Sequence, residues 1–302
     1  MSLQLIFDAL AMGGIYAIAA LGIALIFGVM RLVNFAHGQF IACAVFALIV
    51  PSTDALAVLG LGRLPATVLI PVIIGVGAGL AVAAEALVFR QMRNASPVTL
   101  MVGSFALGVA LQNLLLVLYG GRPKAVSLWA ELGHPVQIAS AEVPLLQLIV
   151  ILAVGLILGG LALLLRHTRI GLEMRAAAQD FEMARMLGVR ANRVISGAFA
   201  LSGGLAAVVA LVLVAQTGVA DVRMGGQIML VAFIATVVGG MGSLSGAVAA
   251  GLAIGAASAF LQAGLPAEVR PFRDAFLYGG VILVLLFRPQ GLFAPVGARP
   301  RV

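Results

Sequence analysis

Long uninterrupted runs of apolar residues limit the folds open to this chain more than any other feature. A helix that crosses a lipid bilayer needs roughly 20 such residues, and five runs approach or exceed that length: residues 10–30, 66–89, 98–119, 144–165 and 194–216. Backbone N–H and C=O groups find no water in hydrocarbon, so a single run satisfies them only as a helix. The runs predict an all-α polytopic membrane protein.

Three further apolar segments leave the number of helices open. Residues 35–50 are short for a span, and residues 276–287 are shorter still. Residues 226–262 are too long for one span and contain the glycine-rich stretch Gly239–Gly246, so we interpret them as two pieces that meet at a break. The total is eight or nine transmembrane or membrane-embedded helices. Nine would put the N-terminus outside the cell, and eight would put it inside.

Composition confirms the membrane class and excludes others. Charged residues make up only 10% of the 302 residues and hydrophobic residues 63%, whereas a soluble domain carries about 25% charge. The net charge of +7 comes from basic residues in the short connections between apolar runs, as the positive-inside rule expects. It does not indicate nucleic-acid binding. A single cysteine, Cys43, and three widely separated histidines (His37, His134 and His167) predict no metal site.

One connection, residues 168–193, is the only sustained charged segment. It holds five of the 17 arginines and three of the 11 acidic residues, which predicts a cytoplasmic position. Read as a helix, it has one apolar stripe made of Ala177, Phe181, Ala184 and Gly188. Asp180 suits the cap of a short helix and Gly188 its end. Such an element is typical of a site to which another protein binds. The alternative is a loop that is solvated or lies on lipid headgroups.

Polar side chains within or beside the apolar runs are costly in a membrane and are therefore candidate functional residues. Asn34, His37 and Gln39 lie together between the first two runs. They suit the wall of a solute pathway, but a tight turn with Asn34 capping the next helix explains them equally well. Gln112 and Asn113 either line a pathway or form hydrogen bonds between helices, and the second interpretation is the simpler one.

Two other features have plain structural explanations. Glu85 stands near the end of its run and is expected to pair with Arg90 or Arg93. The glycines of the break (Gly239, Gly240, Gly242 and Gly246) favour close helix packing, and the functional alternative is a broken helix beside a cavity.

The chain offers no signature of catalysis. No lysine follows the glycine-rich break, so this stretch is not a phosphate-binding loop and the chain does not hydrolyse ATP. Neither a Gly-x-Ser-x-Gly elbow nor a His-Glu-x-x-His pair is present. We therefore expect a protein that is not an enzyme.

Several stretches resemble LivH-type permeases, the membrane subunits of bacterial ATP-binding-cassette (ABC) importers for branched-chain amino acids. Residues 14–40 resemble the family's opening through Asn34-Phe-Ala-His-Gly, with Gln39 where the family usually has glutamate. Gln112-Asn113, the glycines from Gly239 to Gly246 and the closing LLFRPQGL at 285–292 resemble family motifs too. Glu85 with Arg90 and Arg93 fits a family pattern in which Gln91 replaces a proline. The matches are spread over nearly the whole chain.

This resemblance implies a single permease domain over residues 1–302, multi-pass in the bacterial inner membrane. Residues 168–193, which we call the coupling segment, would then contain the coupling helix that docks on an ATP-binding subunit, through Arg175, Ala178, Asp180, Phe181, Glu182, Ala184, Leu187 and Gly188. Small and apolar side chains at Ala177, Phe181, Ala184 and Leu187 would enter the partner's groove. Ala184→Arg is therefore expected to uncouple ATP hydrolysis from uptake without unfolding the chain.

The implied partners are a LivM-like second permease, two ATP-binding subunits and a periplasmic substrate-binding protein, in contact with membrane lipid and no nucleic acid. The chain itself would bind no cofactor, since ATP is used by partner subunits. The cargo would be branched-chain or related small amino acids. The main rival is an ion-coupled secondary transporter of small polar solutes, which usually shows an intramembrane acid and inverted repeats. Glu85 is the only clear intramembrane carboxylate, and no convincing repeat is visible.

Overall fold

The computed structural model describes residues 3–50, 58–93, 95–138 and 141–293. Six of its helices are long and apolar enough to cross a membrane, which confirms the predicted all-α polytopic class. They are α1 (Leu3–Met30), α3 (Ala66–Ala84, continued by a π-helical turn at Glu85–Phe89), α4 (Pro97–Tyr119), α5 (Leu145–His167), α8 (Ala191–Thr217) and α10 (Leu244–Gly264).

The shorter apolar helices among the described residues are α2 (His37–Ala47) and α9 (Met224–Gly239), and α11 (Arg273–Phe287) packs against α10. These helices fit the predicted eight or nine: eight without α11 and nine with it. Two polar helices, α6 (Arg169–Gln179) and α7 (Phe181–Met186), occupy the coupling segment. Short 3₁₀ turns cover Leu61–Arg63, Ala130–Gly133 and Arg270–Phe272.

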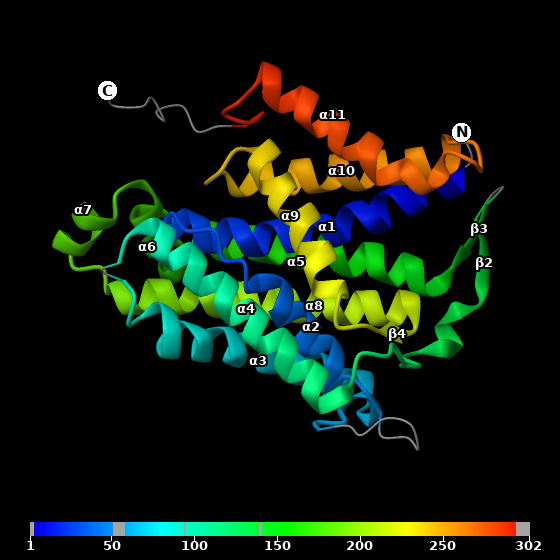
Figure 1. Ribbon diagram of the computed structural model, residues 1–302, viewed down its shortest axis with the longest axis horizontal. Coiled ribbons are helices and arrows are strands. Elements are labelled where there is room, and N and C mark those ends of the chain that lie inside the picture. Colours follow the sequence, from blue (N-terminus) through cyan, green and yellow to red (C-terminus); the bar gives the residue numbers. More distant parts are fainter. Residues whose placement is uncertain (1–2, 51–57, 94, 139–140, 294–302) are drawn as a thin grey trace.

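The two ends of the bundle carry different structures (Figure 1). Helices α6 and α7 lie at one end, which we call the α7 end. At the other, the hairpin end, α1 begins and the antiparallel strands β2 (Pro135–Ile138) and β3 (Ala141–Pro144) pair. Strand β1 (Lys124–Ala125) pairs with β4 (Val219–Ala220) and joins the loop after α4 to the end of α8. The N-terminal helix thus starts opposite the coupling segment.

Helices α1 and α8 form the centre of the bundle, and most of their residues are buried. Helix α1 packs most extensively against α10. A Cβ atom added to Gly13 would lie 2.9 Å from the carbonyl oxygen of Leu252, so the two backbones touch directly. Small residues permit this approach, and in lipid close packing holds helices together. Helices α4 and α5 instead expose long apolar faces.

The short helices α2 and α9 run in opposite directions and meet at their first turns. A Cβ atom on Gly38 would lie 2.5 Å from the carbonyl oxygen of Gly225, and one on Gly225 would collide with the carbonyl oxygen of Gly38. Irregular backbone at residues 31–36 leads into α2, and residues 218–223 lead into α9.

The glycine-rich break forms a closely packed turn, and Val238 just before it lines a cavity. Gly240 and Gly242 adopt positive φ in the turn between α9 and α10, and Gly239 and Gly246 pack backbone to backbone. The segment after α11 covers this turn, because the backbone N–H of Leu292 donates to the carbonyl of Val238 at 2.7 Å. The irregular backbone that precedes the two short helices lies elsewhere, at residues 31–36 and 218–223.

Candidate functional site: the coupling segment and the polar residues of the bundle

The coupling segment folds as two capped helices rather than one. Thr168 accepts a hydrogen bond from the N–H of Gly171 at the start of α6, and Asp180 accepts one from Met183 at 2.9 Å at the start of α7. Gly188 has φ +90° and ends α7, with the N–H of Val189 bonded to the carbonyl of Ala184 at 3.1 Å. Asp180 and Gly188 therefore have the predicted capping roles.

The break at Asp180 changes which side chains face outward. Ala177 and Ala184, predicted to enter a partner's groove, are each only 3% exposed and pack within this chain. That part of the prediction is wrong, because the expected stripe assumed one continuous helix. Ala184→Arg would consequently disturb the packing of α7 itself.

The segment exposes large apolar side chains in two places: Ile170 and Leu172 on α6, and a group of three on α7 and just after it. Leu187, one of the predicted residues, is 79% exposed, and the sequence analysis missed its neighbours Met183 and Met186. We call these three residues the α7 tip. Asp180 and Glu182 are exposed beside the tip, whereas Phe181 is half-buried. Met183 and Met186 are spaced i, i+3, which places them on one face of a helix. This spacing becomes informative only once the limits of α7 are known.

Two arginines tie the coupling segment to the bundle. Arg175 donates to the carbonyl oxygen of Arg166 near the end of α5 at 3.2 Å, and Arg31 donates to that of Ala178 near the end of α6 at 3.0 Å. Cations at helix C-termini satisfy free carbonyls and favour the helix dipole. Arg31 directly follows α1, so α6 is attached to the chain that leads into α2.

Glu85 forms the predicted pair with Arg90 and also one with Arg93. Its carboxylate is fully buried, accepts from Arg90 at 2.8 Å and from Arg93, and accepts from the hydroxyl of Ser196 at 2.9 Å. The carboxylate raises the pKa of the Arg90 guanidinium by hydrogen bonding and charge attraction. Arg93 also donates to Asn192 on α8. The π-helical turn after α3 is thereby fastened to the start of α8, the helix that follows the coupling segment.

The three polar residues around the start of α2 are buried, but they do not form one wall. Asn34 accepts from the N–H of Ala36 at 3.1 Å in a local turn, and the cap residue of α2 is Ala36, so the expected Asn34 cap is wrong. His37 lies against Gly22 of α1 and its Nδ1 is 3.0 Å from the hydroxyl of Ser202 on α8. Gln39 lies against α4.

Each of these three side chains keeps one buried polar atom without a hydrogen bond among the described residues. The atoms are Asn34 Nδ2, His37 Nε2 and Gln39 Oε1. Buried polar groups are normally paired, so an unpaired set at an irregular segment needs a water, a ligand or a rearrangement. The sequence identified these positions, but only the fold shows that all three are buried around the start of α2.

Gln112 and Asn113 lie on α4 and differ in exposure. Gln112 is half-buried, and Asn113 is exposed and donates only to the carbonyl of Val109 one turn earlier, at 2.8 Å. Among the residues that the structure describes, Asn113 therefore forms none of the interhelical hydrogen bonds that the simpler interpretation expected. Ser104 and Tyr119 of α4 do bind other segments, and neither was predicted from the sequence. The hydroxyl of Tyr119 accepts from the N–H of Val58 at 3.2 Å. Ser104 contacts the segment before α2. Its hydroxyl accepts from the N–H of Phe35 at 3.1 Å.

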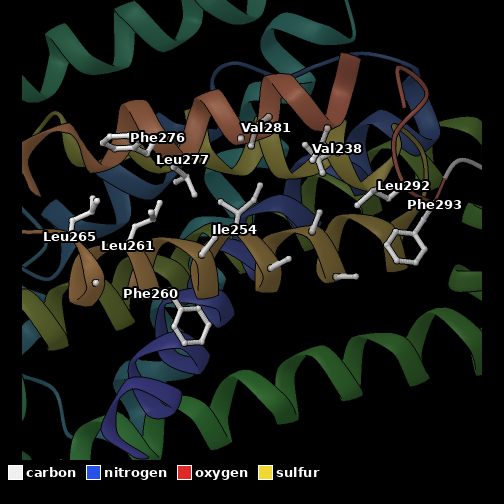
Figure 2. Close-up of a pocket in the computed structure, with 17 residues that line it drawn as sticks. Val238, Ile254, Phe260, Leu261, Leu265, Phe276, Leu277, Val281, Leu292 and Phe293 are labelled. Atoms are coloured by element: carbon white, nitrogen blue, oxygen red, sulfur yellow. The ribbon is translucent and has the colours of Figure 1, made fainter. Parts of the chain in front are cut away.

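An apolar groove of about 900 Å³ lies between α10 and α11 (Figure 2). Labelled side chains such as Ile254, Phe276 and Leu277 converge on it, and no charged residue lines it. It suits hydrocarbon rather than a polar solute. Among the described residues, no group of three His, Cys, Asp or Glu side chains is placed to hold a metal ion.

Comparison with known proteins agrees with this architecture. Residues 5–286 match the family described as branched-chain amino acid transport system / permease component. BraD of Pseudomonas aeruginosa, a high-affinity branched-chain amino acid transport system permease protein, is 30% identical over 99% of this chain and 97% of its own length. LivH of Escherichia coli K12, with the same description, is 30% identical over 99% and 96%.

A more distant relative is the probable LivH permease of Methanocaldococcus jannaschii, 28% identical over 96% of this chain and 90% of its own. No solved structure gives a significant match. The family consists of transport components rather than enzymes. A match over nearly the whole chain, together with a bundle of apolar helices, shows that this protein belongs to the permease components of branched-chain amino acid transport systems.

Proposed function

We propose that the chain forms one half of the translocation pathway of an ABC importer for branched-chain or related small amino acids. The observation that carries this proposal is the α7 tip: Met183, Met186 and Leu187 expose apolar surface on a charged element at one end of the bundle. Such a patch is unfavourable in water and has the composition of the centre of a protein interface.

The proposed partners follow from this role. The α7 tip docks on one of two ATP-binding subunits, and a LivM-like second permease provides the other half of the pathway. A periplasmic substrate-binding protein delivers the amino acid at the hairpin end. The chain acts as a single permease domain of the inner membrane and binds no cofactor itself, because ATP is used by the partner subunits.

Arginine placement supports this orientation. The α7 end carries Arg31, Arg90, Arg93, Arg166, Arg288 and the five arginines of the coupling segment. By the positive-inside rule that end is cytoplasmic. The start of α1, at the hairpin end, is then outside the cell, as expected for nine membrane helices.

Motion of the docked coupling segment has two routes into the bundle. One runs from Ala178 through Arg31 to residues 31–36, where Asn34, His37 and Gln39 have unpaired polar atoms. The other runs along the start of α8, through Asn192 and Ser196, to Glu85. We propose that separation of α2 from α9 exposes these polar atoms to the solute. Gln112 and Asn113 line the same pathway, because an exposed asparagine within a span is unfavourable in lipid.

The rival function, an ion-coupled transporter, finds no support at Glu85. An intramembrane carboxylate that carries ions must be able to lose its partners during the cycle. Glu85 is held by two arginines and a serine at the cytoplasmic edge of the bundle. Glu85 is therefore a structural residue that is held by fixed partners.

The docking role predicts the effect of one substitution at the α7 tip. Leu187→Asp places a charge in the apolar contact and is expected to lower ATP-driven uptake about ten-fold or more, since buried apolar anchors carry much of an interface's free energy. The measurement is amino-acid uptake by the complete importer in proteoliposomes, together with recovery of the ATP-binding subunits when the permease is purified.

The matched control is Leu59→Asp, the same change at a leucine that is 54% exposed near the hairpin end. It should leave both uptake and subunit recovery unchanged. Both variants should keep the unfolding midpoint of the parent. Full uptake and normal recovery of the ATP-binding subunits with Leu187→Asp would exclude docking through the α7 tip.

A further inference from the structure

A second cavity, of about 400 Å³, opens at the hairpin end of the bundle. It lies between the start of α1, the start of α5, and the ends of α8 and α10. Unlike the groove of Figure 2, it contains a carboxylate and three carboxamides: Asp8, Gln147, Gln216 and Gln262. We call it the Asp8 cavity. A pocket with a few converging polar groups and an apolar remainder is typical of small-molecule sites.

Asp8 provides the negative side of this cavity. One carboxylate oxygen accepts a hydrogen bond from the amide nitrogen of Gln147 at 2.8 Å, which orients the group. No other described residue hydrogen-bonds to Asp8, and no basic residue lines the cavity. The charge is thus fixed in place without a cationic partner, at the end of a span where an ionised group is costly. A ligand with an ammonium group would supply the missing charge.

Gln262 provides the opposite, donor side. Its Oε1 accepts a hydrogen bond from Nη1 of Arg273 at 3.3 Å, and this bond leaves the amide nitrogen of Gln262 to donate. Arg273 itself lies in an adjoining cavity, where it also pairs with Asp274 at 2.8 Å. Gln262 lines both cavities and so stands between the guanidinium and the Asp8 cavity. This side suits a carboxylate.

Apolar side chains form the rest of the lining, among them Leu5, Met12 and Leu146. One step deeper, Gly13 of α1 and Gly255 of α10 pack backbone to backbone. Two of the four helices around the cavity, α1 and α10, are therefore in direct contact beside it.

We propose that the Asp8 cavity is an outward-facing binding site for a zwitterionic amino acid with an aliphatic side chain. The ammonium group binds Asp8, the carboxylate binds the amide of Gln262, and the side chain lies against Leu5, Met12 and Leu146. This inference rests on the proposed function, because it gives the importer a site that receives the amino acid from the binding protein.

The test measures ligand affinity in the complete importer in lipid nanodiscs, without the binding protein. The probes are leucine, 4-methylpentanoate, which lacks the ammonium group, and leucinamide, which lacks the carboxylate. Asp8→Asn should weaken leucine binding about ten-fold or more, the range for a hydrogen bond to a charged group. It should not weaken 4-methylpentanoate binding, because that ligand has no ammonium group to pair with the carboxylate and its own negative charge is repelled by Asp8.

A second variant tests the opposite side of the cavity. Gln262→Met, at an exposed position, should weaken binding of leucine and 4-methylpentanoate and leave leucinamide unchanged. Glu142→Gln, an exposed carboxylate of strand β3 that does not line the cavity, is the control and should change none of the affinities. Because Gln262 is exposed, Gln262→Met is expected to fold. This variant therefore tests the proposal even when Asp8→Asn fails to fold.

The outcomes separate the two proposals. ATP-dependent uptake by the parent importer, combined with unchanged leucine affinity in both variants, overturns the Asp8 site and leaves the proposed function standing. Absence of measurable leucine binding by the parent overturns the site as well. Uptake by the chain without its ATP-binding subunits overturns the proposed function, whatever the affinities are.

Discussion

Glu85→Leu is expected to destabilise the protein by about 3–5 kcal/mol, the cost of removing one partner from a buried ion pair. The carboxylate is fully buried and accepts from Arg90, Arg93 and Ser196. Its loss leaves Arg93, whose side chain is 22% exposed, with an uncompensated charge between α3 and α8. The measurement is the midpoint of thermal unfolding in detergent, which should fall by several degrees.

Two further variants sharpen this test. Glu268→Ala removes an exposed carboxylate in the turn after α10 and should leave the midpoint unchanged. Glu85→Leu combined with Arg93→Met removes both charges and should recover part of the lost stability, since apolar replacement of a whole buried pair is often close to neutral. A single Glu85→Leu variant as stable as the parent would show that the cluster contributes nothing.

Gly225→Ala is the second substitution with a large expected effect. The added methyl group would collide with the carbonyl oxygen of Gly38, so α2 and α9 must move apart at their crossing. Overpacking of this kind costs about 1–3 kcal/mol and more where backbone must shift. We expect a loss of about 3 kcal/mol, measured as a lower unfolding midpoint, and reduced uptake because the crossing no longer closes.

The adjacent residue provides a close control. Gly226 belongs to the same first turn of α9, and a Cβ atom added there meets nothing within 4 Å. Gly226→Ala should therefore be neutral or slightly stabilising, because alanine is the better helix former by about 1 kcal/mol. Equal midpoints for the two variants would show that α2 and α9 do not touch at Gly38 and Gly225.

Helix positions could be predicted from the sequence wherever bilayer thickness sets the length. The run 66–89 coincides with α3 and its π-helical turn, and the run 98–119 differs from α4 by one residue. The prediction was less accurate for α2, which covers only His37–Ala47 of the run 35–50. Apolar content does not distinguish a helix from irregular backbone buried in the same bundle, and Leu48 and Ile49 are buried without being helical.

The candidate functional residues likewise divide into those that the sequence predicted correctly and those that it did not. Local chemistry was sufficient for Asp180 and Gly188, because a cap and a positive-φ glycine depend on neighbouring residues alone. It was also sufficient for the pairing of Glu85, whose partners lie five and eight residues away. Local chemistry failed for Ala177 and Ala184, because their burial depends on where α6 ends.

The sequence by itself determined that this chain spans a membrane, where most of its helices lie, and which polar residues are unusual there. These properties follow from hydrocarbon thickness and from the cost of placing polar groups in it. The tertiary structure alone decided that α2 and α9 cross at two glycines, that the α7 tip faces outward, and that Asp8 and Gln262 border one cavity. The physical reason is that each of these contacts joins segments far apart in the sequence, and close packing between helices leaves no local pattern by which to foresee it.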